Sequence, residues 1–187
     1  MDRKQSRISV HTMTRIALST AVICILGPLS LVIPVSPVPV SFGILGIFLA
    51  VYLNDAYYGV LSCLLYILIG FAGVPVFAGF TAGLGKLAGP TGGYIIGYLP
   101  LSLIAGFFVS RYEHNIPMQV LGMVLGTLSC YLIGTAWLSV SAHMSFSAAL
   151  MAGVIPFVPA DAVKIFAAVH IGIPVRAGVR RFSEAGQ

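Results

Sequence analysis

The chain has 187 residues, of which 58% are hydrophobic and only 8% are charged, and its formal net charge is +5. With a mean hydropathy of +1.01, this composition excludes an ordinary soluble domain and indicates an integral membrane protein. Because a spanning helix needs about 20 mostly apolar residues, the chain has room for about six spans. The positive charge does not indicate nucleic-acid binding, since the basic residues lie at the two ends and in one interior loop, without interleaved aromatic residues.

Basic residues set the expected orientation in the membrane. They gather before the first apolar run and after the last one, at Arg3, Lys4, Arg7, Arg15, Arg176, Arg180 and Arg181. Because Lys and Arg collect on the cytoplasmic side, both termini are expected in the cytoplasm, which requires an even number of spans. We therefore expect one transmembrane substrate-binding domain over residues 1–187, with a polar cytoplasmic amino terminus at 1–13 and a basic cytoplasmic tail at 175–187.

Pro, Gly and charged residues divide the chain into six predicted helices, so the expected class is all-α. In chain order they cover residues 14–33, 41–53, 56–72, 91–110 and 118–138, followed by a last helix that ends near His170. The second helix is short for a full span and is expected to be tilted or met by neighbouring loops. Outside the cell we expect a proline-rich loop after the first helix, the glycine-rich segment 73–90 and the loop around His143.

The stretch PFVPADAVKIFAAVHIG (156–172) places Asp161 and Lys164 in an otherwise apolar run. An ionised side chain at mid-bilayer costs roughly 2.5 to 3.5 kcal/mol on insertion scales, so such residues are functional candidates by default. At positions i and i+3 the two share one helix face and can partly neutralise each other. Pro156 and Pro159 interrupt the helix just before the pair, which puts Asp161 in a first turn, where the helix dipole favours a carboxylate. The pair predicts a ligand site reached from outside, with a structural ion pair as the alternative.

A second unusual stretch, GVPVFAGFTAGLGKLAGPTGGYIIGY (73–98), is rich in glycine. It does not match a phosphate-binding loop, because five residues separate Gly79 from Gly85 and Leu87 follows Lys86. Its glycines let the backbone approach a ligand closely. Thr91 is expected to cap the next helix, whose free N–H groups suit a carboxylate. The alternative is a flexible outer loop.

Three fragments, GVPVFAG (73–79), GPTGGY (89–94) and PFVPADAVK (156–164), resemble in this order the BioY family of biotin-specific substrate-binding subunits of energy-coupling factor transporters. PVPVSFGILG is also similar to that family's first loop and second helix. The resemblance implies a six-helix membrane subunit that captures biotin from outside and works with a transmembrane coupling protein and two ATPase subunits. It further implies that Ala17 and Ala21 face the coupling protein.

The resemblance also implies which residues contact biotin. These are Asp161, Lys164 and the glycine-rich segment, within which our candidate contacts are Phe77, Lys86, Gly89, Thr91, Gly92, Gly93 and Tyr94. Two departures affect the wall of the site. Family members often have Thr-Leu-Gln where this chain has Ser41-Phe42-Gly43, and Lys86 stands where an uncharged residue is expected.

The chemistry of biotin is compatible with these residues. Its ureido ring offers two N–H donors and one carbonyl acceptor, whereas an ionised Asp only accepts and a Lys only donates. Asp161 can therefore take the N–H groups and Lys164 the carbonyl. The valerate carboxylate could then meet Lys86 or the amides near Gly92 and Gly93. The reverse orientation, with the carboxylate on Lys164, stays open.

The resemblance implies high-affinity biotin capture by a multi-pass protein of a prokaryotic plasma membrane, and we expect no cofactor and no catalysis. Biotin, the coupling protein, the two ATPases and membrane lipids are the expected partners, and nucleic acid is not. The runner-up is a small ion- or proton-coupled carrier that uses Asp161 as its coupling site. An intramembrane enzyme is disfavoured, because the chain has no H-E-x-x-H pair and no second intramembrane acid beside Asp161.

Overall fold

The computed structural model describes residues 9–32 and 36–185. In chain order its elements are α1 (Val10–Leu26), β1 (Ser30–Leu31), β2 (Val40–Ser41), α2 (Gly43–Leu53), α3 (Ala56–Phe71), α4 (Leu84–Ala88), α5 (Gly92–Arg111), α6 (Ile116–Ser141), α7 (Phe146–Gly153) and α8 (Val158–Ala185). The two short strands form one antiparallel pair, in which Ser30 lies opposite Ser41. The predicted all-α class is confirmed.

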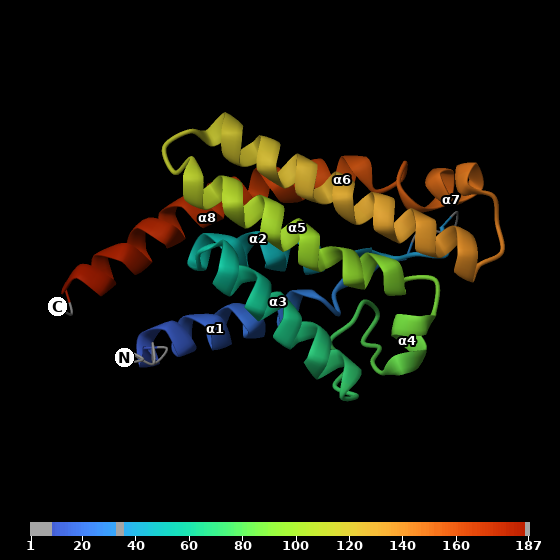
Figure 1. Ribbon diagram of the computed structural model, residues 1–187, viewed down its shortest axis with the longest axis horizontal. Coiled ribbons are helices and arrows are strands. Elements are labelled where there is room, and N and C mark those ends of the chain that lie inside the picture. The colour runs from blue at the N-terminus through green and yellow to red at the C-terminus, as the bar shows by residue number, and fades with distance from the viewer. Residues whose placement is uncertain (1–8, 33–35, 186–187) are drawn as a thin grey trace, which may run out of the picture.

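The helices α5 and α6 form the most extensive helix pair of the bundle. Glycines bring their backbones together: a Cβ atom on Gly97 would lie 3.1 Å from the Cα of Cys130, and one on Gly126 would lie 2.9 Å from the carbonyl oxygen of Leu101. α3 packs on α5, while α1 and α8 both pack on α2 (Figure 1). Nine of the 11 residues of α2 are buried, so this short helix forms the interior of the bundle.

The first helix ends at Leu26, earlier than the predicted position 33. Pro28 has no backbone N–H and therefore cannot continue the hydrogen-bond ladder of the helix. The N–H of Gly27 closes the helix on the carbonyl of Ile23 at 2.7 Å, and the chain then enters β1. Position 33 itself lies outside the described residues.

The last helix continues past His170, where it was predicted to end, and runs through Pro174 to Ala185. Residues 175–185, expected to be a tail, therefore belong to a helix. A proline inside a helix removes one backbone hydrogen bond and can bend the helix without ending it. The expected outer loops likewise contain short helices, α4 in the glycine-rich segment and α7 after His143.

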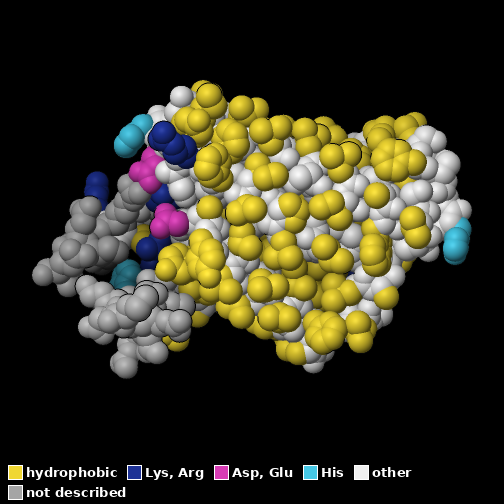
Figure 2. All heavy atoms as spheres, viewed as in Figure 1, with side chains coloured by type: hydrophobic (Ala, Val, Ile, Leu, Met, Phe, Trp, Pro, Cys, Tyr) yellow, Lys and Arg dark blue, Asp and Glu magenta, His cyan; other side chains and the backbone are white. Residues whose placement is uncertain are grey.

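Within residues 9–32 and 36–185, three helices are long and apolar enough to cross a membrane: α5, α6 and the part of α8 from Val158 to Val179. The apolar helices α1, α2 and α3 are shorter, at 17, 11 and 16 residues. Apolar side chains cover most of the middle of the molecule in Figure 2. Exposed apolar surface of this extent is unusual in soluble monomers, and it is what a lipid environment accommodates.

The two ends of the bundle differ in charge. α1 begins and α8 ends at the same end of the molecule, on the left in Figure 1, whereas α4 and α7 lie at the opposite end. The charged side chains that Figure 2 shows gather at the left end. The bundle therefore has a charged end, defined by the start of α1 and the end of α8, and an opposite end that carries α4 and α7.

Candidate functional site

A buried ion pair lies in the first turns of α8. After α7 the chain makes a turn at residues 154–157 before α8 begins, and the N–H of Asp161 donates to the carbonyl of Phe157 at 2.8 Å. The Nζ of Lys164 lies 2.7 Å from Oδ1 of Asp161. Asp161 is 3% exposed and Lys164 is 5% exposed. The predicted interruption of the chain before the pair, and the shared helix face of the two residues, are confirmed.

Tyr131 of α6 completes the pair. Its buried hydroxyl donates a hydrogen bond to Oδ2 of Asp161. Both carboxylate oxygens therefore already accept a hydrogen bond, and each keeps a lone pair for a further donor. A buried ion pair is tolerated when its geometry is good and additional hydrogen bonds satisfy its remaining polar atoms. The Tyr131 hydroxyl supplies one of those bonds.

Sequence reasoning missed Tyr131, which stands 30 positions before Asp161. It belongs to none of the motifs, and the interval does not correspond to a helix face. The one signal available was a tyrosine inside a predicted span, because a buried tyrosine hydroxyl usually needs a hydrogen-bond partner.

The ion pair lines a small cavity of about 40 Å³, the first cavity. Its wall is built by segment 38–41 together with α2, α5, α6 and α8, since the other lining side chains include Ser41, Ile44, Tyr94, Tyr98, Tyr131 and Phe157. Four different helices therefore converge on Asp161 and Lys164. Among the described residues that line this wall, only Asp161 and Lys164 carry an ionised group.

A second cavity, of about 30 Å³, lies beside the first one. The two share Val38, Pro39, Ser41, Tyr94 and Tyr98 in their walls. The second cavity is also lined by Lys86 of α4 and by Thr91, which precedes α5. Tyr94 and Tyr98 thus line both cavities. The Asp161–Lys164 ion pair lies in the first cavity, and Lys86 lies in the second.

This arrangement can hold a ligand with polar groups at both ends. Asp161 offers an acceptor and Lys164 a donor in the first cavity, and Lys86 offers a second donor in the other. The tyrosine and aliphatic side chains between them provide an apolar middle, which is the usual composition of a small-molecule site. Within the described ranges, the His, Cys, Asp and Glu side chains form no group of three or more that could hold a metal ion.

The other proposed contact residues fall into two groups. Lys86, Thr91 and Tyr94 line the cavities, with Tyr94 shared by both. Phe77 lines neither cavity: it is fully buried, and its ring packs edge-on against Tyr66 with the ring centres 5.6 Å apart.

Three glycines of the proposed set also lie outside the cavity walls. A Cβ atom on Gly92 would stand 1.7 Å from the carbonyl oxygen of Leu87, and one on Gly93 would stand 2.2 Å from the Cβ of Trp137. The carbonyl of Gly89 accepts a hydrogen bond from the indole N–H of Trp137 at 2.9 Å. These glycines let α4 and α6 approach the start of α5, and so fix the position of the residues that do line the second cavity.

The Ser41-Phe42-Gly43 stretch leads from β2 into α2. The hydroxyl of Ser41 donates to the carbonyl of Gly27 at 2.9 Å and accepts from the N–H of Gly43 at 2.9 Å. A Cβ atom on Gly43 would lie 3.4 Å from the hydroxyl oxygen of Tyr98, so a larger residue here would press on the cavity wall. The departure at Ser41-Phe42-Gly43 therefore lies at the start of α2, next to both cavities.

Ala17 and Ala21 lie on the exposed face of α1. The opposite face of the same helix is buried, through Ile16, Thr20 and Ile23. The two alanines are therefore available to another helix, and they line neither cavity.

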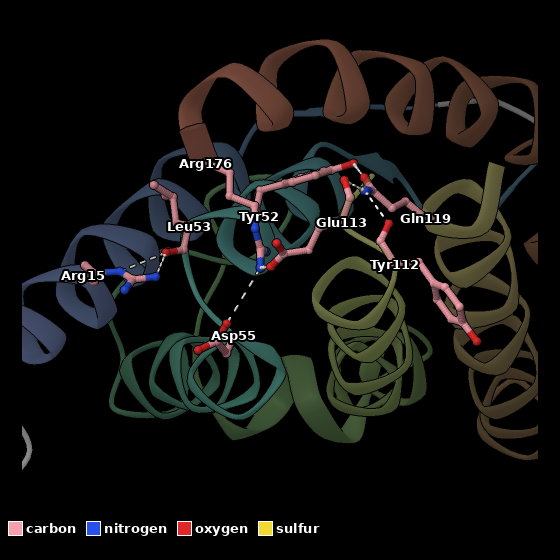
Figure 3. Close-up of polar contacts among 8 residues, drawn as sticks. All are labelled: Arg15, Tyr52, Leu53, Asp55, Tyr112, Glu113, Gln119 and Arg176. Carbon is pink, nitrogen blue, oxygen red and sulfur yellow. Dashed lines mark hydrogen bonds and ion pairs between the residues drawn. The ribbon is translucent and has the colours of Figure 1, made fainter. Parts of the chain in front are cut away.

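A second polar cluster lies at the charged end of the bundle (Figure 3). Arg176 of α8 points toward Glu113 in the turn between α5 and α6, and their Nη2 and Oε1 atoms are 2.6 Å apart. The same guanidinium lies 3.8 Å from a carboxylate oxygen of Asp55. From α1, the Nε of Arg15 donates to the carbonyl of Leu53, the last residue of α2, at 3.0 Å. Arg15 of the first helix and Arg176 of the last helix therefore connect neighbouring segments at the charged end through a hydrogen bond and ion pairs.

Gln119 is the buried centre of this cluster. Its Oε1 accepts from the hydroxyl of Tyr52 at 2.8 Å, and its Nε2 donates to the carbonyls of Tyr112 and Glu113 at 2.9 and 2.8 Å. Gln119 is 1% exposed, and all of its side-chain polar atoms take part in these hydrogen bonds. The cluster holds the end of α2 to the α5–α6 turn.

Together, the lipid-suited surface, the short central helix and the buried ion pair at a cavity define a helical membrane protein that binds a small polar molecule. The sequence profile of the BioY family matches residues 1–181, and the chain belongs to this family.

Curated relatives and a solved structure agree with this membership. Biotin transporter BioY2 of Lactococcus lactis subsp. cremoris is 34% identical over 88% of this chain and 89% of its own length. A probable biotin transporter BioY of Pyrococcus horikoshii is 37% identical over 74% of this chain and 81% of its own length. A crystal structure described as the S-component for biotin from an ECF-type ABC transporter matches with a TM-score of 0.83 and 30% identity, covering 95% of each chain. These are transport proteins, in agreement with the expectation that the chain is not an enzyme.

We predict that Gln119→Leu lowers the free energy of unfolding by about 2 to 4 kcal/mol, because it removes three hydrogen bonds at the centre of the cluster, including the one that the Tyr52 hydroxyl donates. Tyr52→Phe removes a single hydroxyl and is expected to cost about 1 kcal/mol. Thermal unfolding in detergent, followed by circular dichroism, measures both. Equal stability of the two variants would contradict a central role for Gln119.

Proposed function

We propose that this chain captures biotin from outside the cell, as the membrane-embedded substrate-binding subunit of an ATP-driven vitamin transporter. Membership of the BioY family supports this function, as do relatives named biotin transporters and a structural neighbour that is an S-component for biotin. The observation that carries it in this chain is the buried Asp161–Lys164 pair, which presents an acceptor and a donor side by side to a cavity.

The ureido ring of biotin fits the pair. Its two N–H groups meet the free lone pairs of the Asp161 carboxylate, and its carbonyl meets the Lys164 ammonium. Tyr131 holds one carboxylate oxygen and so fixes the direction of the remaining lone pairs. Hydrogen bonds to ionised groups are stronger than neutral ones, which supports tight binding of an uncharged ring.

The rest of the ligand extends along the tyrosine rings shared by the two cavities. Tyr94 contacts it directly, with Thr91 and Lys86 beyond. Gly89, Gly92 and Gly93 act indirectly, by letting α4 and α6 approach the start of α5, and Phe77 acts indirectly by packing the glycine-rich segment on Tyr66 of α3. The two cavities measure about 40 and 30 Å³, well below the several hundred Å³ of a typical ligand pocket. The side chains that line both cavities therefore move apart when biotin enters.

The chain crosses a prokaryotic plasma membrane six times as a single domain, with both termini in the cytoplasm. The common end of the first and last helices, and the charged side chains gathered there, support this orientation. The spans α1, α2 and α3 are short, and neighbouring segments such as the β1–β2 pair complete the crossing. The two cavities then open toward the outside.

Energy comes from other polypeptides, because the chain carries no G-x-x-x-x-G-K-[ST] nucleotide loop. The partners are a transmembrane coupling protein and two ATPase subunits, and the coupling protein docks on the exposed face of α1. Ala17 and Ala21 support this surface, because small residues four positions apart allow another helix to approach closely.

The purified chain is expected to retain biotin, and desthiobiotin with its intact ureido ring, but not riboflavin or thiamine. Equilibrium binding of the four labelled vitamins, in detergent or lipid vesicles, measures this selectivity. Failure of folded protein to retain biotin, with folding verified by a cooperative thermal transition, would remove the proposed function.

Asp161→Asn and Lys164→Met are each expected to weaken biotin binding by about 2 to 5 kcal/mol, because each leaves the other charge buried without its partner. Asp55→Asn is the matched control, since Asp55 is an exposed carboxylate at the charged end of the bundle and should leave the affinity unchanged. Isothermal titration gives the three affinities, and thermal unfolding shows that each variant is folded. Parental affinity in either pair variant would make the ion pair purely structural.

Replacing both Ala17 and Ala21 with Leu is expected to separate uptake from binding. The added bulk fills the surface that a coupling-protein helix needs, while the cavities stay unchanged. The variant should bind biotin normally and fail in ATP-dependent uptake and in co-purification with the coupling protein. Ala136→Leu, at an exposed position of α6, should affect neither. A loss of binding would make the two alanines internal packing residues, and retention of uptake would place the docking surface elsewhere.

A further inference from the structure

A larger cavity, the charged-end cavity, lies at the charged end of the bundle, away from the ion pair of α8. It measures about 240 Å³ and is lined by Tyr52 at the end of α2, by the α5–α6 turn, by Gln119 of α6 and by Arg176 with its neighbours on α8. Among the described residues, none lines both this cavity and the first or second one. Because roughly 10 to 15 Å³ suffices for one water molecule, the charged-end cavity has room for a group of the size of a phosphate.

Arg176 brings a cation to this wall, and its guanidinium is only partly paired (Figure 3). Its Nη2 lies 2.6 Å from Oε1 of Glu113 and 3.8 Å from a carboxylate oxygen of Asp55. Its Nε and Nη1 are buried and have no hydrogen-bond partner among the described residues. These two nitrogens carry three of the five N–H donors of a guanidinium. Unpaired buried donors cost free energy, so Arg176 can bind an acceptor that the folded chain does not itself supply.

The position of Arg176 along α8 indicates which acceptor is at hand. The apolar part of this helix runs from Val158 to Val179, and Arg176 lies in its last turn. At 1.5 Å per residue, Val158 and Arg176 are about 27 Å apart along the helix, close to the ~30 Å thickness of the hydrocarbon core of a bilayer. With the charged end in the cytoplasm, Arg176 therefore lies where the head groups of the inner leaflet begin. A lipid phosphate is the acceptor present at this depth.

The charge of this end favours an anion despite the acids beside Arg176. Asp55 and Glu113, together with Glu184 near the end of α8, are outnumbered by arginines at positions 15, 111, 176, 180 and 181. Glu113 and Asp55 both approach Nη2, which leaves the other two nitrogens of the guanidinium to a further acceptor. Hydrogen bonds between a guanidinium and a phosphate are charge-assisted and stronger than neutral ones. The net charge of the end and the unpaired donors therefore both suit a phosphate.

We propose that the charged-end cavity is a phosphate-binding site, in which Nε and Nη1 of Arg176 donate to the phosphate group of a membrane lipid. This inference rests on the proposed cytoplasmic position of the charged end, but not on biotin binding. A phosphate held there joins α8 to the α5–α6 turn beside Gln119, and so stabilises the folded chain. Free phosphate offers the same chemistry from the cytoplasm, and the test separates the two sources.

The test adds three probes to the purified chain in detergent: dioctanoyl phosphatidylglycerol, dioctanoylglycerol, which lacks the phosphate, and inorganic phosphate. Phosphatidylglycerol is expected to raise the midpoint of thermal unfolding in a saturable way, because a ligand that binds only the folded protein stabilises it. Dioctanoylglycerol should leave the midpoint unchanged. An equal shift with inorganic phosphate would support the site and make free phosphate its ligand.

Three variants connect the effect to Arg176. Arg176→Lys keeps a charge beside Glu113 but lacks the donors at Nε and Nη1, and it is expected to weaken the binding of phosphatidylglycerol about tenfold. Arg176→Gln removes the charge as well and should weaken binding further. Arg111→Gln is the matched control, because Arg111 is an exposed arginine at the same end, with its guanidinium 5.9 Å from the centre of the Tyr112 ring, and does not line the cavity. Its Kd for phosphatidylglycerol should equal that of the parent.

Three outcomes would overturn the phosphate site. An equal shift of the midpoint by dioctanoylglycerol assigns the effect to the acyl chains. Equal weakening in Arg111→Gln and Arg176→Lys assigns it to diffuse attraction by the charged end. No shift with either phosphate compound leaves the donors to another acceptor, and loss of the coupling protein from Arg176→Lys would then identify that acceptor as an acidic segment of the partner.

Biotin affinity, measured on the same samples, separates this inference from the proposed function. It should match the parent in all three variants, because the charged-end cavity and the two cavities beside the ion pair have separate walls. A folded parent that binds phosphatidylglycerol but no biotin would overturn the proposed function and support the phosphate site.

Discussion

The constraint on which this structure depends is the burial of two ionised side chains in an apolar bundle. Asp161 and Lys164 are almost fully enclosed, and burial of charge is tolerated only with close pairing and further hydrogen bonds. Pairing follows from their spacing on α8, and the further bond comes from Tyr131 on α6. The break before α8 adds to this, because it puts the carboxylate in a first helical turn, where the dipole favours it. The burial of Asp161 and Lys164 therefore depends on two features that meet at one place: the start of α8 and the Tyr131 hydroxyl of α6.

The short helix α2 connects the two polar regions of the bundle. Its first turn carries Ile44 in the wall of the first cavity, and its last residue, Leu53, accepts hydrogen bonds from Arg15. An apolar helix of 11 residues cannot span a bilayer of about 30 Å by itself. It serves instead as the interior against which α1 and α8 pack. Arg15 and Gln119 hold its last turn at the charged end of the bundle, and Ser41 holds its first turn through the N–H of Gly43.

The glycine-rich segment contributes in two different ways. Gly92 and Gly93 are required because side chains at these positions would overlap Leu87 and Trp137. That close packing places Thr91 and Lys86 along the wall of the second cavity. The segment thus contains a short helix, α4, and does not match a phosphate-binding loop. Its glycines give the backbone its position, and the neighbouring polar side chains supply the chemistry.

Local spacing in the sequence was sufficient for some of these features. Hydropathy defined the class of protein, the i and i+3 spacing put Asp161 and Lys164 on one face, and the prolines before them marked the start of α8. These depend on neighbours within one helical turn, which the sequence displays directly. Hydropathy alone extended the first helix beyond Leu26, because an apolar extended segment and an apolar helix have the same composition.

Only the tertiary structure decided which distant residues meet. Tyr131 reaches Asp161, and Lys86 shares a cavity with Thr91, because α4, α5, α6 and α8 converge at one end of the bundle. The same packing turned Phe77 and three glycines of the motif into supports of the site instead of its walls. Contacts of this kind depend on how helices cross and how closely their backbones approach. Neither quantity is encoded in the spacing of residues along one helix.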